Sequence, residues 1–97
     1  MSNSLDGPHL SIRATATTTP SIARVGASNL DERKTVVIQA VENRIYVGFS
    51  SSVSNSGVNR GLELKKDQVL YFGAGPDVDV YVVSNSGNKD YVVWELS

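Results

Sequence analysis

The feature that most constrains the fold is a series of short segments in which β-branched residues alternate with other residues. Residues 35–48, TVVIQAVENRIYVG, show the pattern most fully, on both sides of the polar pair Glu42 and Asn43. An alternation with period two places successive side chains on opposite faces of a strand. Because the polar break is short, antiparallel pairing of its two flanks is the most local solution. The segment predicts a β-hairpin with one buried face.

Similar segments recur along the chain and are separated by turn residues. They cover residues 21–25, 62–64, 68–72, 77–83 and 91–96, and the last two are expected to form a second hairpin. A Ser/Asn/Gly-rich surface loop is predicted over 49–61, a turn over 73–76, and one helical turn over 30–34. About seven strands with frequent turns indicate an all-β fold, a small antiparallel β-barrel or sandwich.

The N-terminal segment has a different composition. Residues 1–20 carry Ser, Asn, Gly, Pro and a Thr-rich tract, and their large apolar side chains, such as Leu10 and Ile12, offer too little apolar area to hold the segment down. We expect an extended N-terminal arm over 1–20, which docks on something or stays mobile, and one β-domain over 21–97.

Composition excludes several classes of function. The net charge is −1, and the nine basic residues form no stripe, so a nucleic-acid partner is not expected. The chain has no cysteine, which excludes disulfides and thiolate sites. Apolar runs of strand length, and a start without a basic and apolar leader, predict neither a membrane span nor a signal peptide. We expect a product made in the cytoplasm.

No spacing of residues predicts a catalytic centre. Gly48-Phe49-Ser50 lacks the helix that a nucleophile elbow requires, and the single histidine, His9, lies in the expected arm. We therefore expect no enzyme activity and no cofactor. Asp77 and Asp79 share one face of a strand and leave two interpretations open, a calcium site or two solvated carboxylates.

The aromatic residues are the most informative candidates for binding. Tyr46, Tyr81 and Tyr91 on a common outward face would suit a protein interface or stacking on sugars, whereas the alternative is that some are core residues. Trp94 is assigned to the core with Val92 and Leu96.

The order of the segments resembles a group of small β-barrel proteins of tailed bacteriophages. The resemblance rests on a charged pair before TVVIQ, then IYVGFSSSV, a Gly-x-Leu-x-Leu segment, VYVVSNSG and a final VVWEL, and covers about residues 20–97. The chain departs from the group at Arg60-Gly61-Leu62, where the group often carries Pro-Leu.

The resemblance implies a structural protein of the virion, a capsid decoration or cement protein that stabilises the head. The alternative is a tail-associated or head-fibre module that recognises a host glycan or receptor. The expected partners are the major capsid protein, other virion proteins and further copies of the chain in a homo-oligomer, a trimer by the resemblance. The candidate interface residues are Leu10, Ile12, Tyr46, Ser51, Val53, Val58, Arg60, Tyr81 and Tyr91.

Overall fold

The computed structural model describes residues 9–26 and 29–97, and its regular structure is almost entirely β. The only helical element of the described chain is one 3₁₀ turn, η1, at Gly57–Asn59. The strands are β1 His9–Ala16, β2 Ser21–Ile22, β3 Thr35–Ala40, β4 Ile45–Gly48, β5 Leu62–Leu64, β6 Val69–Gly73, β7 Tyr81–Ser84 and β8 Lys89–Leu96. The all-β prediction is confirmed.

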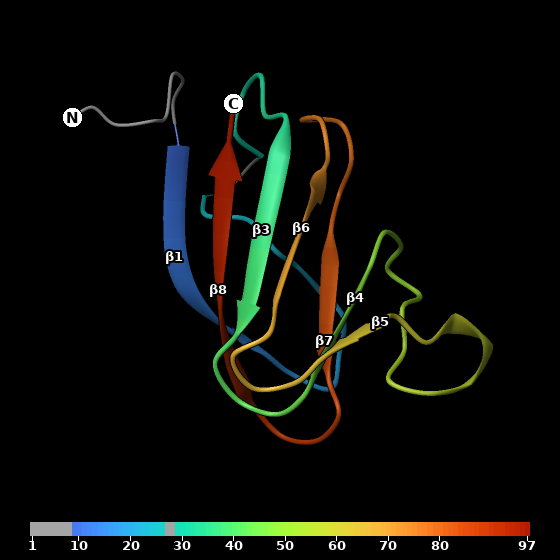
Figure 1. The fold of residues 1–97 in the computed structure, drawn as a ribbon. Helices are drawn as coiled ribbons and strands as arrows, with labels where there is room; N and C mark the ends of the chain where they lie inside the picture. The colour runs from blue at the N-terminus through green and yellow to red at the C-terminus, as the bar shows by residue number, and fades with distance from the viewer. Residues whose placement is uncertain (1–8, 27–28) are drawn as a thin grey trace.

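The strands form two antiparallel four-stranded sheets that pack face to face (Figure 1). Sheet 1 has the order β1-β8-β3-β6, and sheet 2 has the order β2-β7-β4-β5. Among these strands, β4 and β5 are the one consecutive pair that shares a sheet, and every other connection passes to the opposite sheet. This strand order is that of a jelly roll, a double-sheet sandwich.

Both expected hairpins are wrong in their pairing. Strands are present within all four expected segments, but the segment expected over 77–83 is a strand only from Tyr81. β3 pairs with β6 and β8, while β4 pairs with β5 and β7. Likewise, β7 and β8 lie in different sheets. The polar segments that follow β3 and β7 are therefore arches between the sheets. A short polar break in the sequence is compatible with an arch as well as with a hairpin, so the break alone does not distinguish the two.

The core lies between the two sheets and consists mainly of small and β-branched side chains. Sheet 1 contributes Val36, Ile38 and Val93, all with no exposed surface, and sheet 2 contributes Ile45 and Val82. Since residues i and i+2 of a strand share a face, each strand buries one alternate set. β3 shows this directly, with Val36, Ile38 and Ala40 buried.

The segment expected to be an arm belongs in part to the sandwich. Residues 9–16 form β1, which pairs along its whole length with β8, from His9 opposite Leu96 to Ala16 opposite Lys89. Ala16 is fully buried, so a small side chain is sufficient to anchor the strand end. Residues 9–16 of the expected arm are thus a strand of sheet 1, and residues 1–8 lie outside the described residues.

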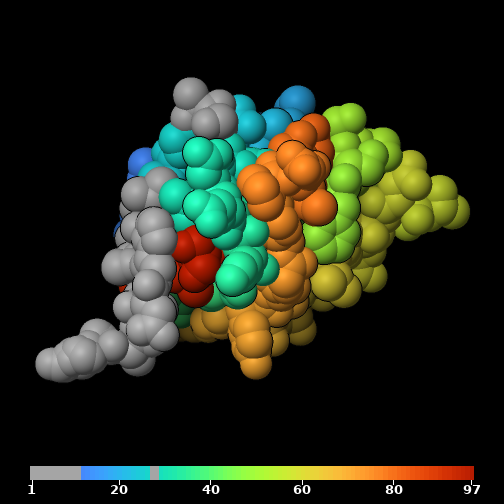
Figure 2. All heavy atoms as spheres, turned by 90° about the horizontal axis from the view of Figure 1, so that it is seen from above, coloured from blue at the N-terminus to red at the C-terminus, as the bar shows by residue number. Residues whose placement is uncertain are grey.

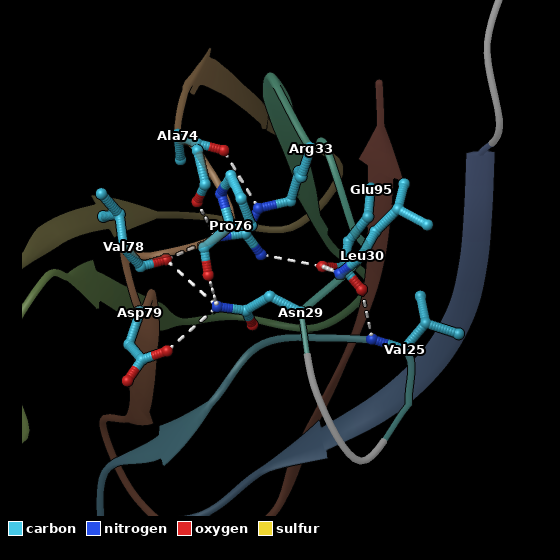
Figure 3. A network of polar contacts seen from close by, with 10 residues as sticks. Val25, Asn29, Leu30, Arg33, Ala74, Pro76, Val78, Asp79 and Glu95 are labelled. Atoms are coloured by element: carbon cyan, nitrogen blue, oxygen red, sulfur yellow. Dashed lines mark hydrogen bonds and ion pairs between the residues drawn. The ribbon is translucent and has the colours of Figure 1, made fainter.

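The expected helical turn at 30–34 is instead a single tight turn, in which the Arg33 backbone N–H donates to the Leu30 carbonyl at 3.1 Å. This turn delivers Arg33 into the interior, where its side chain and that of Glu95 have no exposed surface. Arg33 Nη1 donates to Glu95 Oε2 at 2.8 Å (Figure 3).

The remaining hydrogen-bonding groups of this ion pair are used by loop backbone. The Arg33 guanidinium also donates to the carbonyls of Ala74, Gly75 and Val78. The Glu95 carboxylate accepts the backbone N–H groups of Val25 and Leu30 at 2.9 and 3.1 Å. One ion pair thus joins the loop before β3, the loop after β6 and the end of β8. Sequence reasoning missed it.

Candidate functional surfaces

The outer face of sheet 1 carries an apolar row across its strands. Trp94 on β8 lies opposite Val37 on β3, and Val37 lies opposite Tyr71 on β6. The row below it contains Val92, Gln39 and Val69, in the same register. Tyr71 is 74% exposed and Trp94 is 40% exposed. This row is an aromatic and aliphatic surface.

The assignment of Trp94 to the core is therefore wrong, and so is the assignment of Tyr91 to an interface. β8 buries Tyr91, Val93 and Glu95 and turns Trp94 outward. Burial raises the pKa of Tyr91 to about 12, because the interior disfavours the phenolate. The alternation in the sequence predicts the strand β8 correctly, but it does not predict which of the two faces of the strand is buried.

The outer face of sheet 2 is covered by the loop over residues 49–61. Val53 of this loop packs with Tyr46 and Val83 in a second small cluster, against which Tyr81 also packs. Tyr46 and Val53 are buried, with 4% and 7% of their surface exposed, so their assignment to an interface is wrong. Tyr46 and Tyr81 do lie on the outer face of sheet 2, as expected, but Val53 of the loop packs against this face.

Two glycines allow the loop to lie this close to the sheet. A Cβ at Gly48 would come within 2.6 Å of Val53 Cγ2, and a Cβ at Gly61 would come within 2.5 Å of the Val47 carbonyl oxygen. Distances this short leave no room for a Cβ unless neighbouring atoms move, so Gly48 and Gly61 allow the close approach of the loop.

Hydrogen bonds within the loop fix its shape. The Ser54 N–H donates to the Asn59 carbonyl at 2.9 Å, and the Gly61 N–H donates to the Ser54 carbonyl at 3.0 Å. Asn55 Nδ2 donates to the Ser84 carbonyl at 3.0 Å, which joins the loop to β7. Ser50 and Ser52 are hydrogen-bonded to each other at 2.9 Å.

Ion pairs hold the base of the loop. Glu63 accepts from Arg44 at 2.8 Å and from Arg60 at 3.3 Å, and Arg60 also lies over the Tyr46 ring. The hydrogen bond from Arg44 is the main reason why the pKa of Glu63 lies below its usual value of 4.5. Arg60, an expected interface residue, therefore has a structural role as well as an exposed position.

The tip of the loop projects beyond both sheets, where η1 lies (Figures 1 and 2). Val58 in η1 is fully exposed, and Phe49 and Leu62 at the two ends of the loop are 58% and 60% exposed. Ser51 is also exposed. Of the expected interface residues, Ser51, Val58 and Arg60 are thus brought together on one projecting loop.

The other expected positions are dispersed. Ile12 on β1 is 43% exposed. Leu10 lies in β1, and its side chain is not among the described parts of the chain. Asp79 accepts from Asn29 Nδ2 at 3.1 Å, and Asp77 is exposed. Within residues 9–26 and 29–97, no group of three or more acidic, histidine or cysteine side chains could hold a metal ion, and no helix could cross a membrane.

The sequence matches no protein-family model, and no curated protein gives a significant match. Its fold is similar to that of the Cupin_2 domain of an XRE family transcriptional regulator from Enterobacter cloacae, with a TM-score of 0.53 and 16% identity over 92% of this chain and 79% of that domain. A structure from Bacillus endospore appendages, described as disulfide-linked pili, has a TM-score of 0.47 and 12% identity over 94% of this chain and 87% of that one. The likeness to the cupin domain supports the double-sheet fold alone and carries no information about activity.

Proposed function

We propose that this protein is a structural subunit of a tailed-phage virion, a decoration or cement protein on the outside of the capsid. The observation that carries the proposal is the loop over 49–61, which is fixed against sheet 2 and presents the fully exposed Val58 at its tip. The resemblance of residues 20–97 to small phage β-proteins supplies the biological setting. Jelly rolls also occur in viral capsid proteins, in lectins and in cupins, so the fold permits this function without specifying it.

A fixed loop is a favourable docking element because its conformational entropy is lost on folding, before any partner binds. Val53 anchors the middle of the loop in the cluster with Tyr46, and Asn55 joins it to β7. Preorganisation of this kind reduces the free-energy cost of association. Exposed Val58 and Phe49 then offer apolar area to a complementary pocket on the partner.

Such a small contact is weak by itself, and a capsid lattice compensates by repetition. If several copies, or several contacts of one oligomer, engage neighbouring capsid subunits, the later contacts form at a high effective concentration. In this proposal the partner is the major capsid protein or another virion protein, and the subunit is made in the host cytoplasm. Its role requires no catalysis and no cofactor.

The proposal is tested by co-sedimentation with undecorated heads of the phage that encodes the chain. Wild-type protein should pellet with the heads and raise their resistance to heat, by mass action on the bound state. Val58→Lys should weaken binding about tenfold or more, since burial of a valine contributes about 1.5–3 kcal/mol. Val78→Lys, an equal change of an exposed valine in another loop, should bind like wild type. Failure of wild-type protein to bind heads would refute the proposal.

A second candidate function is recognition of a host glycan by a tail-associated or head-fibre subunit. It is favoured by Trp94 and Tyr71, which lie on either side of Val37 on the outer face of sheet 1. Exposed aromatic rings on a flat face are suited to stacking on sugars. Binding of host cell-surface polysaccharide that is lost in Trp94→Ala, together with no binding to heads, would favour this function over decoration.

A further inference from the structure

The four strands at the sheet edges differ in how well they are protected from pairing with another chain. β2 has two residues and β5 has three, and Glu63 of β5 is held in ion pairs. β1 carries Arg13, paired with Asp90 at 2.9 Å. β6 reads VLYFG and contains neither a charged residue nor a proline. Short length and charge are the usual protections of an edge, so β6 is the unprotected one.

The register of β6 on β3 shows which of its backbone groups face away from the sheet. The Ala40 N–H donates to the Gln68 carbonyl, and the Ala74 N–H donates to the Lys34 carbonyl. In an antiparallel pair the hydrogen-bonded positions alternate, so Leu70 and Phe72 bond toward β3. The backbone N–H and C=O groups of the other set, Val69, Tyr71 and Gly73, point away from β3 at the free edge of the sheet. They are called the outward groups below. Within the described chain β3 is the one strand paired with β6.

We propose that this edge pairs with the same edge of a second copy of the chain, antiparallel and centred on Tyr71. The outward groups are evenly spaced about Tyr71, so Tyr71 would face Tyr71 of the second copy and Val69 would face Gly73. This pairing is self-complementary and uses all the outward groups in about six backbone hydrogen bonds. A two-fold axis at Tyr71 closes the contact as a dimer.

The side chains favour the same arrangement. Val69 and Tyr71 are 53% and 74% exposed on the outer face of sheet 1. Across the new pair they would extend the apolar row of Trp94 and Val37 into an eight-stranded sheet. Cross-strand pairs of aromatic and β-branched side chains stabilise antiparallel strand pairing.

The dimer should be weak by itself. A five-residue strand gives a contact about 16 Å long, and the buried area falls below the roughly 1,200 Å² at which stable interfaces begin. Association should therefore depend on concentration in the micromolar to sub-millimolar range. The inference does not depend on the capsid proposal, because a protein that dimerises through β6 need not bind heads.

Sedimentation velocity of the full chain over this range tests the dimer. Wild-type protein should shift from monomer to dimer as its concentration rises. Tyr71→Lys should remain monomeric, since it places two ammonium groups opposite each other at the axis. Val58→Lys, with a similar gain of charge on the projecting loop, should dimerise like wild type. Wild-type protein that stays monomeric, or Tyr71→Lys that dimerises equally, would overturn the inference.

Amide hydrogen exchange gives a second readout that identifies the strand. The N–H groups of Val69, Tyr71 and Gly73 should become protected as concentration rises, while those of Leu70 and Phe72 are protected throughout by β3. Protection that does not change with concentration would overturn the inference. A ladder of species larger than dimer would also overturn it, because open-ended growth requires two different edges.

Discussion

Removal of the buried carboxylate by Glu95→Ala should be one of the most destabilising single changes in this protein. Arg33 and Glu95 have fully buried side chains 2.8 Å apart, and the variant would leave the Arg33 charge without a counter-ion. The backbone N–H groups of Val25 and Leu30 would lose their acceptors as well.

The magnitude follows from these contacts. Breaking a buried pair by removing one partner costs about 3–5 kcal/mol, out of a total stability of roughly 5–15 kcal/mol for a domain. For a chain of this length each kcal/mol corresponds to about 4–8 °C in the melting temperature, so Tm should fall by roughly 12–40 °C.

Thermal and urea denaturation followed by circular dichroism would measure the loss. Asp31→Ala, which removes an exposed carboxylate from the same turn, should change stability by about 0.5 kcal/mol or less. The double variant Arg33→Met with Glu95→Ala should lose less than the sum of the two single variants. Additive losses, or a loss below about 1 kcal/mol in Glu95→Ala, would refute the assigned role of the pair.

Three further predictions follow from single contacts. Gly61→Ala should lower the free energy of unfolding by about 1–3 kcal/mol, because the new Cβ would meet the Val47 carbonyl oxygen at 2.5 Å. Gly73→Ala, whose Cβ would have its nearest atom at 3.7 Å, should be nearly neutral in the same thermal denaturation. Equal losses in the two variants would contradict the close approach of the loop at Gly61. In an ultraviolet titration the contribution of Tyr91, defined by Tyr91→Phe, should appear only near pH 12. Because its folded pKa is raised, the stability from its neutral form is complete below about pH 10 and is lost as pH approaches 12; ionisation of Tyr91 near pH 10 in folded protein would contradict its burial. The pKa of Glu63 should lie below 4.5 by NMR titration and rise in Arg44→Ala, and its contribution to stability should be lost as pH falls through that lowered pKa; an unchanged pKa in the variant would argue against the ion pair.

Alternation along the sequence is sufficient to predict the strands but not their partners. Residues 35–40 and 45–48 are strands, as their β-branched patterns predict. Period two assigns residues to two faces, however, and contains no information about which strand lies alongside. The jelly roll places these two strands in different sheets, so long-range packing determined the pairing.

Sequence reasoning also chose the wrong face of β8, for a physical reason. Val92, Trp94 and Leu96 form the more apolar set, whereas the structure buries the set that contains Tyr91 and Glu95. Burial of this carboxylate is tolerated because Arg33 pairs with it, and Arg33 belongs to a polar loop distant in sequence. The sequence does contain one indication: Glu95 lies two residues from Val93 and therefore shares its face of the strand. A glutamate on a face requires either that the face is exposed to solvent or that a buried cation pairs with the carboxylate.

The exposed part of the candidate site was easier to predict than the buried part. A Ser/Asn/Gly-rich loop with Val53 and Val58 indicates a surface segment with few anchors, and Ser51, Val58 and Arg60 are indeed exposed. The sequence could not show that Val53 closes over Tyr46, because this contact depends on the curvature of the returning loop and on Gly61 beneath it.

The proposed decoration of a phage capsid through the projecting loop is tested most directly by an electron cryo-microscopy map of the parent particle. We expect density for the jelly roll at repeated positions on the outer surface of the head, with η1 directed at the capsid lattice. Jelly-roll density on the tail alone, or on a head but with the loop facing solvent, would contradict it.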